Sequence, residues 1–231
     1  MADKYMVWIE STAGSRPQYA PQLAEFGELY SKKLWHQLTL RLEAAIEDPA
    51  FTGDGFLIDL YDNFISGFAH KINLLKLAFL AVAASKQMAS PQQGMAFLDD
   101  VIANLEASKQ PDTEEPILYL KMQIAQYQLL LGNIGDCKNA YLDGEAQLET
   151  MTEVDPQVSA AVHYVSMQYH KEQKEYAAFY RSALMYLAFV SQDTLPADFR
   201  LSLAVDVSLA ALLGEDVYNF GELLVHPIVS C

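Results

Sequence analysis

The stretch LLLGNIGDCKNAYL (Leu129–Leu142) follows the same plan as ALLGEDVYNFGELL (Ala211–Leu224). Each has the end of an apolar helix, a Leu-Gly pair, a short polar turn and the start of a second amphipathic helix. Gly132 and Gly214 lie 82 positions apart, and a turn near Gln173 is halfway between them. This spacing predicts antiparallel helix pairs that repeat about every 40 residues.

The rest of the chain is also helical in pattern. Apolar residues recur three and four positions apart, and Pro- or Gly-containing turns separate about eleven such segments. Residues 1–19 contain Gly14, Ser15 and Pro17, which predicts a loosely ordered leader before a helical-repeat domain at 20–231. We therefore expect an all-α solenoid of helix pairs. A compact irregular helical bundle is the alternative.

Several residues are predicted to have structural roles in these pairs. Gly132 and Gly214 follow apolar helices, where a left-handed residue closes the last turn. Trp35 and His36 are expected to anchor the second helix of the first pair, and Phe220 to pack in the second helix of the last one. We expect Asp155-Pro156 and Ser90-Pro91 to start helices, because each places a capping side chain before a proline.

The charge of the chain argues against nucleic acid and anionic lipid as partners. The net charge is −15, and acidic residues exceed basic ones in both halves of the sequence. The most apolar run, Ile72–Ala84, has 13 residues with Lys76 inside, so it predicts a buried helix rather than a membrane span. The N-terminus has no signal-peptide core, and Cys137 and Cys231 are the only cysteines. These features suit a soluble intracellular protein.

No group of residues in the sequence has the spacing of a catalytic or metal site. His163 and His170 share a helix face, but two turns, roughly 10 Å, separate them. The Gly-rich TGDGF (Thr52–Phe56) lacks a preceding strand and a following lysine, and Cys137 has no activating neighbour. We therefore expect no catalytic residues, cofactor, metal or small-molecule substrate. The aromatic residues of Val162–Val190 are expected to be core, with a peptide-binding groove as the alternative.

Longer strings resemble a known family. They are LYSKKLWHQLTL (29–40), LYDNFISGF (60–68), KINLLKLA (71–78), QYHKEQKEYAAFYRSAL (168–184) and ALLGEDVYNFGELLVHPI (211–228). In this order they are similar to the PCI-type lid subunits of the 26S proteasome called non-ATPase regulatory subunit 13. The resemblance implies a non-catalytic N-terminal solenoid. In the family a winged-helix PCI module and a C-terminal helix follow; this sequence carries neither.

The resemblance also implies a role and partners. The expected role is a structural scaffold in the lid of the proteasome regulatory particle, in ubiquitin-dependent degradation in the cytoplasm and nucleus. The expected partners are other lid subunits, with a ubiquitin-receptor subunit as a further candidate. The alternatives are a free-standing helical-repeat adaptor and a truncated form that does not assemble. Near the end of the sequence, Leu224, Val225, Ile228 and Val229 form a candidate interface that a following repeat or PCI module would cover.

Overall fold

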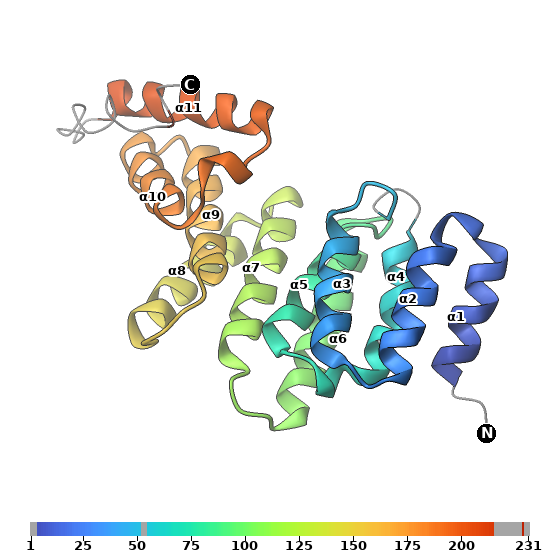
Figure 1. Cartoon of the computed structure of the whole chain (residues 1–231). Coiled ribbons are helices and arrows are strands. Elements are labelled where there is room, and N and C mark those ends of the chain that lie inside the picture. Colours follow the sequence, from blue (N-terminus) through green and yellow to red (C-terminus); the bar gives the residue numbers. More distant parts are fainter. Residues whose placement is uncertain (1–3, 52–54, 215–227, 229–231) are drawn as a thin grey trace. The chain divides into compact units, whose positions relative to one another are not determined.

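The structure is a computed structural model that describes residues 4–51, 55–214 and Ile228 (Figure 1). The α-helices in this part of the chain are α1 (Lys4–Ser15), α2 (Ala20–Ser31), α3 (Trp35–Glu47), α4 (Phe56–Asn63), α5 (Leu74–Ser85), α6 (Pro91–Ser108), α7 (Glu114–Leu130), α8 (Ile134–Thr150), α9 (Pro156–Glu172), α10 (Tyr176–Phe189) and α11 (Ala197–Leu213). Short 3₁₀ segments are η1 (Pro17–Tyr19), η2 (Ile65–Lys71) and η3 (Gln192–Thr194). The described residues contain no β-strand, so the all-α prediction is confirmed.

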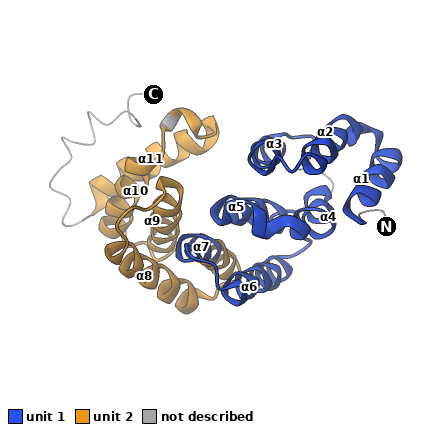
Figure 2. Ribbon diagram, turned by 60° about the horizontal axis from the view of Figure 1, so that its bottom comes forward, with its two compact units in different colours: residues 1–120 blue, residues 121–231 orange. Residues whose placement is uncertain are grey.

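The chain divides into two compact units, residues 1–120 and 121–231 (Figure 2). The sequence predicted one helical-repeat domain over 20–231 with no internal boundary. The observed boundary falls within α7, where the sequence has no glycine- or proline-rich linker to mark it. Loop composition therefore gave no sign of this division.

The first helix of the N-terminal unit corrects the prediction of a loose leader over residues 1–19. Helix α1 occupies Lys4–Ser15 and packs on α2, with Ile9 buried between them. The Tyr5 ring of α1 packs directly against Gly67 in η2. A Cβ added at Gly67 would lie 2.1 Å from Cζ of Tyr5, so only glycine leaves space for this ring. The Ser15–Pro17 breaker ends a helix and does not mark an unstructured segment.

Aromatic rings fill the interior of the N-terminal unit. Phe56, at the start of α4, is fully buried against Tyr19 and Phe51, with ring centroids 4.2 and 5.5 Å away. A second group joins Tyr30 of α2 to Phe64 and Phe68, at 5.4 and 5.8 Å. Such offset and tilted ring pairs add to the free energy gained by burial of the rings.

Helix α5 lies at the centre of the N-terminal unit. It packs on α3, α4 and α6, and it buries apolar residues around most of its circumference. A helix that is apolar on all sides is stable in water only when neighbours surround it. The predicted buried helix within Ile72–Ala84 is therefore confirmed.

In the C-terminal unit, α8 packs on α9, α9 on α10, and α10 on α11. The α9–α10 pair is antiparallel: the hydroxyls of Ser166 and Ser182, equidistant in sequence from Lys174, lie 3.0 Å apart in the buried interface. Helix α9 starts as predicted, since Asp155 accepts a hydrogen bond from the Gln157 amide. The cap at Ser90 in the N-terminal unit is likewise confirmed.

Candidate functional site

The turn after α7 has the left-handed geometry that the sequence predicted. Gly132 has a φ of +81°. Its amide donates to the Leu129 carbonyl at 3.0 Å, and the Asn133 amide donates to the Gln128 carbonyl at 2.9 Å. This pair of bonds is the Schellman motif, which satisfies carbonyl groups that the end of a helix leaves free. A Cβ at Gly132 would meet nothing within 4 Å, so glycine is favoured here for its backbone freedom alone.

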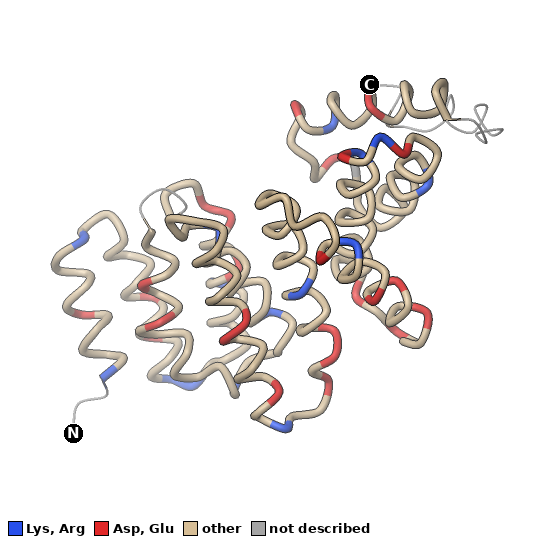
Figure 3. The backbone as a smooth tube through the Cα atoms, turned by 180° about the vertical axis from the view of Figure 1, so that it is seen from behind, with Lys and Arg blue, Asp and Glu red and all other residues tan. Residues whose placement is uncertain are grey.

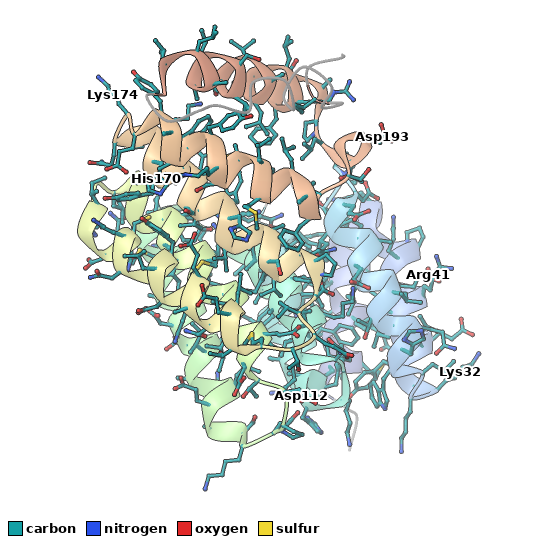
Figure 4. All side chains as sticks on the ribbon, turned by 90° about the vertical axis from the view of Figure 1, so that its left-hand side faces the viewer. Lys32, Arg41, Asp112, His170, Lys174 and Asp193 are labelled. Atoms are coloured by element: carbon teal, nitrogen blue, oxygen red, sulfur yellow. The ribbon has the colours of Figure 1, made fainter. Side chains whose placement is uncertain are left out.

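The same turn closes α9 without a glycine. Lys174 has a φ of +57°, and the Glu175 amide donates to the His170 carbonyl at 3.0 Å. A hydrogen bond also joins Nδ1 of the His170 ring to a Glu175 carboxylate oxygen at 2.6 Å. Figure 4 shows His170 and Lys174 at the same end of this helix pair. Lys174 follows Gly132 by 42 positions, which agrees with a repeat of about 40 residues.

Gly214 does not have the predicted left-handed conformation. It caps α11 with φ −73° and ψ 124°, and its amide donates to the Ala210 carbonyl at 2.8 Å. The chain leaves this helix in an extended direction, which any L-residue can adopt. The Leu-Gly pair that Gly214 shares with Gly132 therefore marks a helix end without fixing the backbone conformation of the glycine.

Trp35 and His36, which were predicted to anchor the same helix, have different surroundings. The Trp35 ring lies in a half-buried position at the start of α3, with its centroid 5.6 Å from Tyr30 and 5.7 Å from Phe68. His36 is exposed, so its predicted anchoring role is wrong. Adjacent helical residues point about 100° apart, and only Trp35 faces the interior.

Most of the predicted tail interface lies outside the described residues. This applies to Leu224, Val225 and Val229, and also to Phe220, which was predicted to have a structural role. Ile228 is described, and it is fully buried in a cluster with residues of α9, α10 and α11. Ile228 is therefore a core residue of the C-terminal unit in this structure, and its placement on an open interface is wrong.

The aromatic residues of α9 and α10 mostly form the interior of the C-terminal unit. Tyr169, Phe179, Tyr180 and Tyr186 are buried. The exposed rings are at the margins, where Phe189 stacks on His163 with centroids 5.7 Å apart. Burial lowers the pKa of His163, and nearby Glu145 partly opposes this. Core packing accounts for most of these aromatics, as expected.

Cys137 is a buried thiol at the start of α8. Burial raises its pKa to about 11, so it is protonated and unreactive at neutral pH. In the described part of the chain, no three His, Cys, Asp or Glu side chains are grouped so as to hold a metal ion.

Sequence reasoning missed an exposed apolar stripe on α11. Leu201, Val205, Leu209 and Leu212 are 63%, 50%, 51% and 69% exposed. They recur every three or four residues, so they share one face of the helix, while Leu203 and Val207 on the other side are buried. The signal was present: α11 is apolar on both sides, as expected of a helix that has neighbours on both. Contiguous exposed apolar surface of this kind often marks a protein-binding site.

Acidic residues are distributed over both units (Figure 3). Helix α8 carries Asp136, Asp143, Glu145 and Glu149 with Lys138 as its single base. Such a surface repels polyanions and favours partners with basic or apolar surfaces. None of the described helices is both long and apolar enough to cross a lipid bilayer.

Helix pairs with left-handed closing turns, together with an exposed apolar helix face, are typical of helical-repeat proteins that bind other proteins. Residues 22–231 match the family model described as PSD13 N-terminal repeats. The chain belongs to this family.

Curated relatives agree with the family match. The chain is 46% identical over 223 residues to the 26S proteasome non-ATPase regulatory subunit 13 homolog A of Arabidopsis thaliana, covering 96% of this chain and 58% of that protein. It is 32% identical to the 26S proteasome regulatory subunit RPN9 of Saccharomyces cerevisiae, and the match covers 93% of this chain and 56% of that protein. It is 30% identical to the 26S proteasome non-ATPase regulatory subunit 13 of Dictyostelium discoideum, and the match covers 98% of this chain and 58% of that protein. The chain thus spans somewhat more than half the length of these relatives.

Proposed function

We propose that this chain is a non-catalytic structural part of the proteasome regulatory particle lid, acting as a protein–protein scaffold in ubiquitin-dependent degradation. The observation that carries the proposal is the family match over 22–231, together with relatives named as non-ATPase proteasome regulatory subunits. The partners would be other lid subunits and a ubiquitin-receptor subunit, in the cytoplasm and nucleus.

The stripe on α11 supports a scaffold role. Leucine side chains at 63% and 51% exposure, as at Leu201 and Leu209, lose solvent contact when another protein covers them. Burial of each such side chain stabilises a complex by roughly 1–2 kcal/mol, in proportion to the apolar area removed from water. Several on one face therefore provide a surface that a neighbouring subunit can use.

A second candidate function is a helical-repeat adaptor that binds a partner outside the proteasome, or a form that does not assemble into the lid. Its support is the exposed apolar stripe on α11, because such a helix face can be covered by a partner other than a lid subunit.

Affinity purification of the tagged chain from cells, with quantitative mass spectrometry, separates the two candidates. The scaffold proposal predicts enrichment of several lid subunits together, in constant proportion across replicates. It also predicts fluorescence of a tagged chain in both cytoplasm and nucleus. Enrichment of one partner without lid subunits would support the adaptor, and no specific partner would indicate a non-assembling form.

A variant directed at α11 tests whether the stripe takes part. We expect L201Q/L209Q to reduce recovery of lid subunits without lowering thermal stability, since both side chains are largely exposed. The matched control is Leu40→Gln on α3, where the side chain is 51% exposed and lies outside the stripe. Equal loss with both variants would show that general surface hydrophobicity, rather than α11, determines recovery.

A further inference from the structure

The N-terminal unit contains a groove that the proposed scaffold role does not use. Its volume is about 490 Å³, and it lies between α6 on one wall and the end of α4 with η2 on the other, with α5 beneath. Phe97, Val101 and Leu105 recur at four-residue intervals along α6 and line it together. At 1.5 Å per residue, this lining extends for about 12 Å, which is long enough for a short peptide segment.

The floor of the groove is apolar. Leu77, Val101 and Leu105 line it and are buried from solvent by the surrounding side chains. Above them, Tyr61 and Phe97 face each other across the walls as an edge-to-face pair with centroids 5.1 Å apart. An aliphatic side chain of a ligand would find apolar contacts at the floor, and a flat or cationic group would find an aromatic face above it.

Tyr61 contributes a phenol to the wall of the groove, and its side chain is only 7% exposed. Burial raises the pKa of this phenol, so it remains protonated at any physiological pH. A protonated phenol at the groove wall can donate a hydrogen bond to a carbonyl group of a bound peptide.

The two walls also carry unpaired carboxylates. Asp62 lines the groove from the α4 side and Asp100 from α6, and neither forms an ion pair within the described ranges 4–51 and 55–214. Asp59, one turn before Asp62, is instead held by Arg16 at 2.9 Å. Partial burial, and to a lesser degree Asp59, raises the pKa of the Asp62 carboxyl. A cation placed in the groove would relieve this destabilisation of the Asp62 carboxylate.

We propose that this groove binds a basic–apolar segment of a partner protein, with an arginine held by Asp62 and Asp100 and a neighbouring apolar side chain on the floor. Arginine suits the site better than lysine, because its planar guanidinium pairs with carboxylates through two parallel bonds and stacks on aromatic rings. Phosphorylated peptides and nucleic acids would be repelled by the same carboxylates. The proposal is independent of the proteasome role, since it concerns residues of the N-terminal unit alone.

Fluorescence anisotropy with short synthetic peptides and the intact chain tests the proposal. The probe is a labelled peptide of about 12 residues with a central Leu-Arg-Leu, a length typical of groove-bound segments. Matched probes carry citrulline, the neutral isostere of arginine, or lysine at the centre. We expect the arginine peptide to bind at least about tenfold more tightly than the citrulline peptide, a difference typical of a charge-assisted contact.

Protein variants locate the binding. Asp62→Asn and Asp100→Asn should each remove most of the preference for arginine, while leaving thermal melting unchanged, because both side chains are exposed at the rim. The matched control is Asp99→Asn, which removes the same charge one position away on α6 and outside the groove. It should bind the arginine peptide as the unaltered chain does.

Three results would overturn the proposal. One is equal affinity for the arginine and citrulline peptides. Another is an equal loss in Asp99→Asn and Asp100→Asn, which would indicate attraction to the overall negative charge. The third is no arginine-dependent binding up to about 1 mM, a concentration at which even weak peptide sites are partly occupied. Recovery of lid subunits by the tagged chain would be unaffected by any of these results, so the two proposals fail separately.

Discussion

The two units of the molecule are stabilised in different ways. The N-terminal unit depends on single contacts between aromatic rings, such as Phe56 against Tyr19 and the fit of Tyr5 over Gly67. The C-terminal unit also buries aromatic rings, but its helices are mostly longer. Helices α7 and α9 end in the left-handed turn that also ends α2 at Lys33. The close fit of Tyr5 on Gly67 in the first unit is therefore sensitive to side-chain volume, whereas the closing turns that both units share are sensitive to backbone conformation.

This difference matters for how such chains tolerate change. The contact of Tyr5 with Gly67 joins one side chain of α1 to one glycine, so its loss affects one helix strongly. A closing turn occurs repeatedly, and Lys174 shows that it tolerates a residue other than glycine at some cost.

The largest effect is expected from truncation of the aromatic interior. Phe56→Ala removes a fully buried ring that contacts Tyr19, Phe51 and Trp8, and it should lower the free energy of unfolding by about 3–5 kcal/mol. The same change at Phe189 in the C-terminal unit removes a ring that is 39% exposed and stacked on His163. We expect a loss of about 0.5–1.5 kcal/mol there. Urea unfolding measures both, and equal losses would show that burial of the ring does not determine the cost of truncation.

The next effect concerns the docking of α1. Gly67→Ala places a Cβ where the Tyr5 ring lies, so the ring must move. We expect a loss of about 1–3 kcal/mol, typical of an overpacked site, and faster amide hydrogen exchange across α1. Adding Tyr5→Ala removes the clash, so the double variant should lose less than the sum of the two single variants. Strict additivity would show that Gly67 does not position α1 through this contact.

A smaller effect separates two glycines of the C-terminal unit. Gly132→Ala forces a side chain into the left-handed region at φ +81° and should cost about 1–2 kcal/mol. Gly214→Ala occupies φ −73°, and it should be neutral or stabilise by up to about 1 kcal/mol, because alanine restricts the unfolded chain. Thermal and urea unfolding give both values. A larger loss at Gly214 than at Gly132 would reverse the assignment of the two caps.

The smallest effect is the pH dependence of His163. Burial lowers the pKa of this ring from its ordinary value of 6.5. As the pH falls through 6.5, the unfolded chain takes up a proton that the folded chain resists, so the free energy of unfolding decreases. Below the folded pKa, both states are protonated and the decrease stops.

His163→Phe keeps a ring to stack on Phe189 and removes this titration. Urea unfolding at pH 7.5 and pH 5.5 should therefore show a smaller loss of stability for the variant than for the unaltered chain. The same pH dependence in both proteins would mean that other groups account for it.

The sequence predicted the features that depend on local chemistry. Helix starts at Ser90 and Asp155 and the left-handed cap at Gly132 follow from residues within a few positions of each other. Features that depend on distant contacts were missed or wrong. Nothing in the local sequence distinguishes α1 from a loose leader. Two of the contacts that hold it, Tyr5 with Gly67 and Trp8 with Phe56, join residues that are far apart in the sequence.

The candidate sites divide in the same way. The Trp35 ring packs beside Tyr30 and Phe68, whereas His36, which was assigned the same role, is exposed. The groove could not be predicted, because Asp62 and Asp100 come from separate helices whose register is set by packing on α5. The stripe on α11 was visible as apolar residues on both sides of one helix, and only the structure showed which side is open.

The most direct measurement is the backbone φ of Gly132, Lys174 and Gly214 in solution, from three-bond HN–Hα couplings and backbone chemical shifts of the protein labelled with ¹⁵N and ¹³C. A C-terminal unit closed by recurring left-handed turns requires positive φ at Gly132 and Lys174 and negative φ at Gly214. Negative φ at Gly132 and Lys174 would contradict it, since the Schellman bonds that end α7 and α9 could not then form.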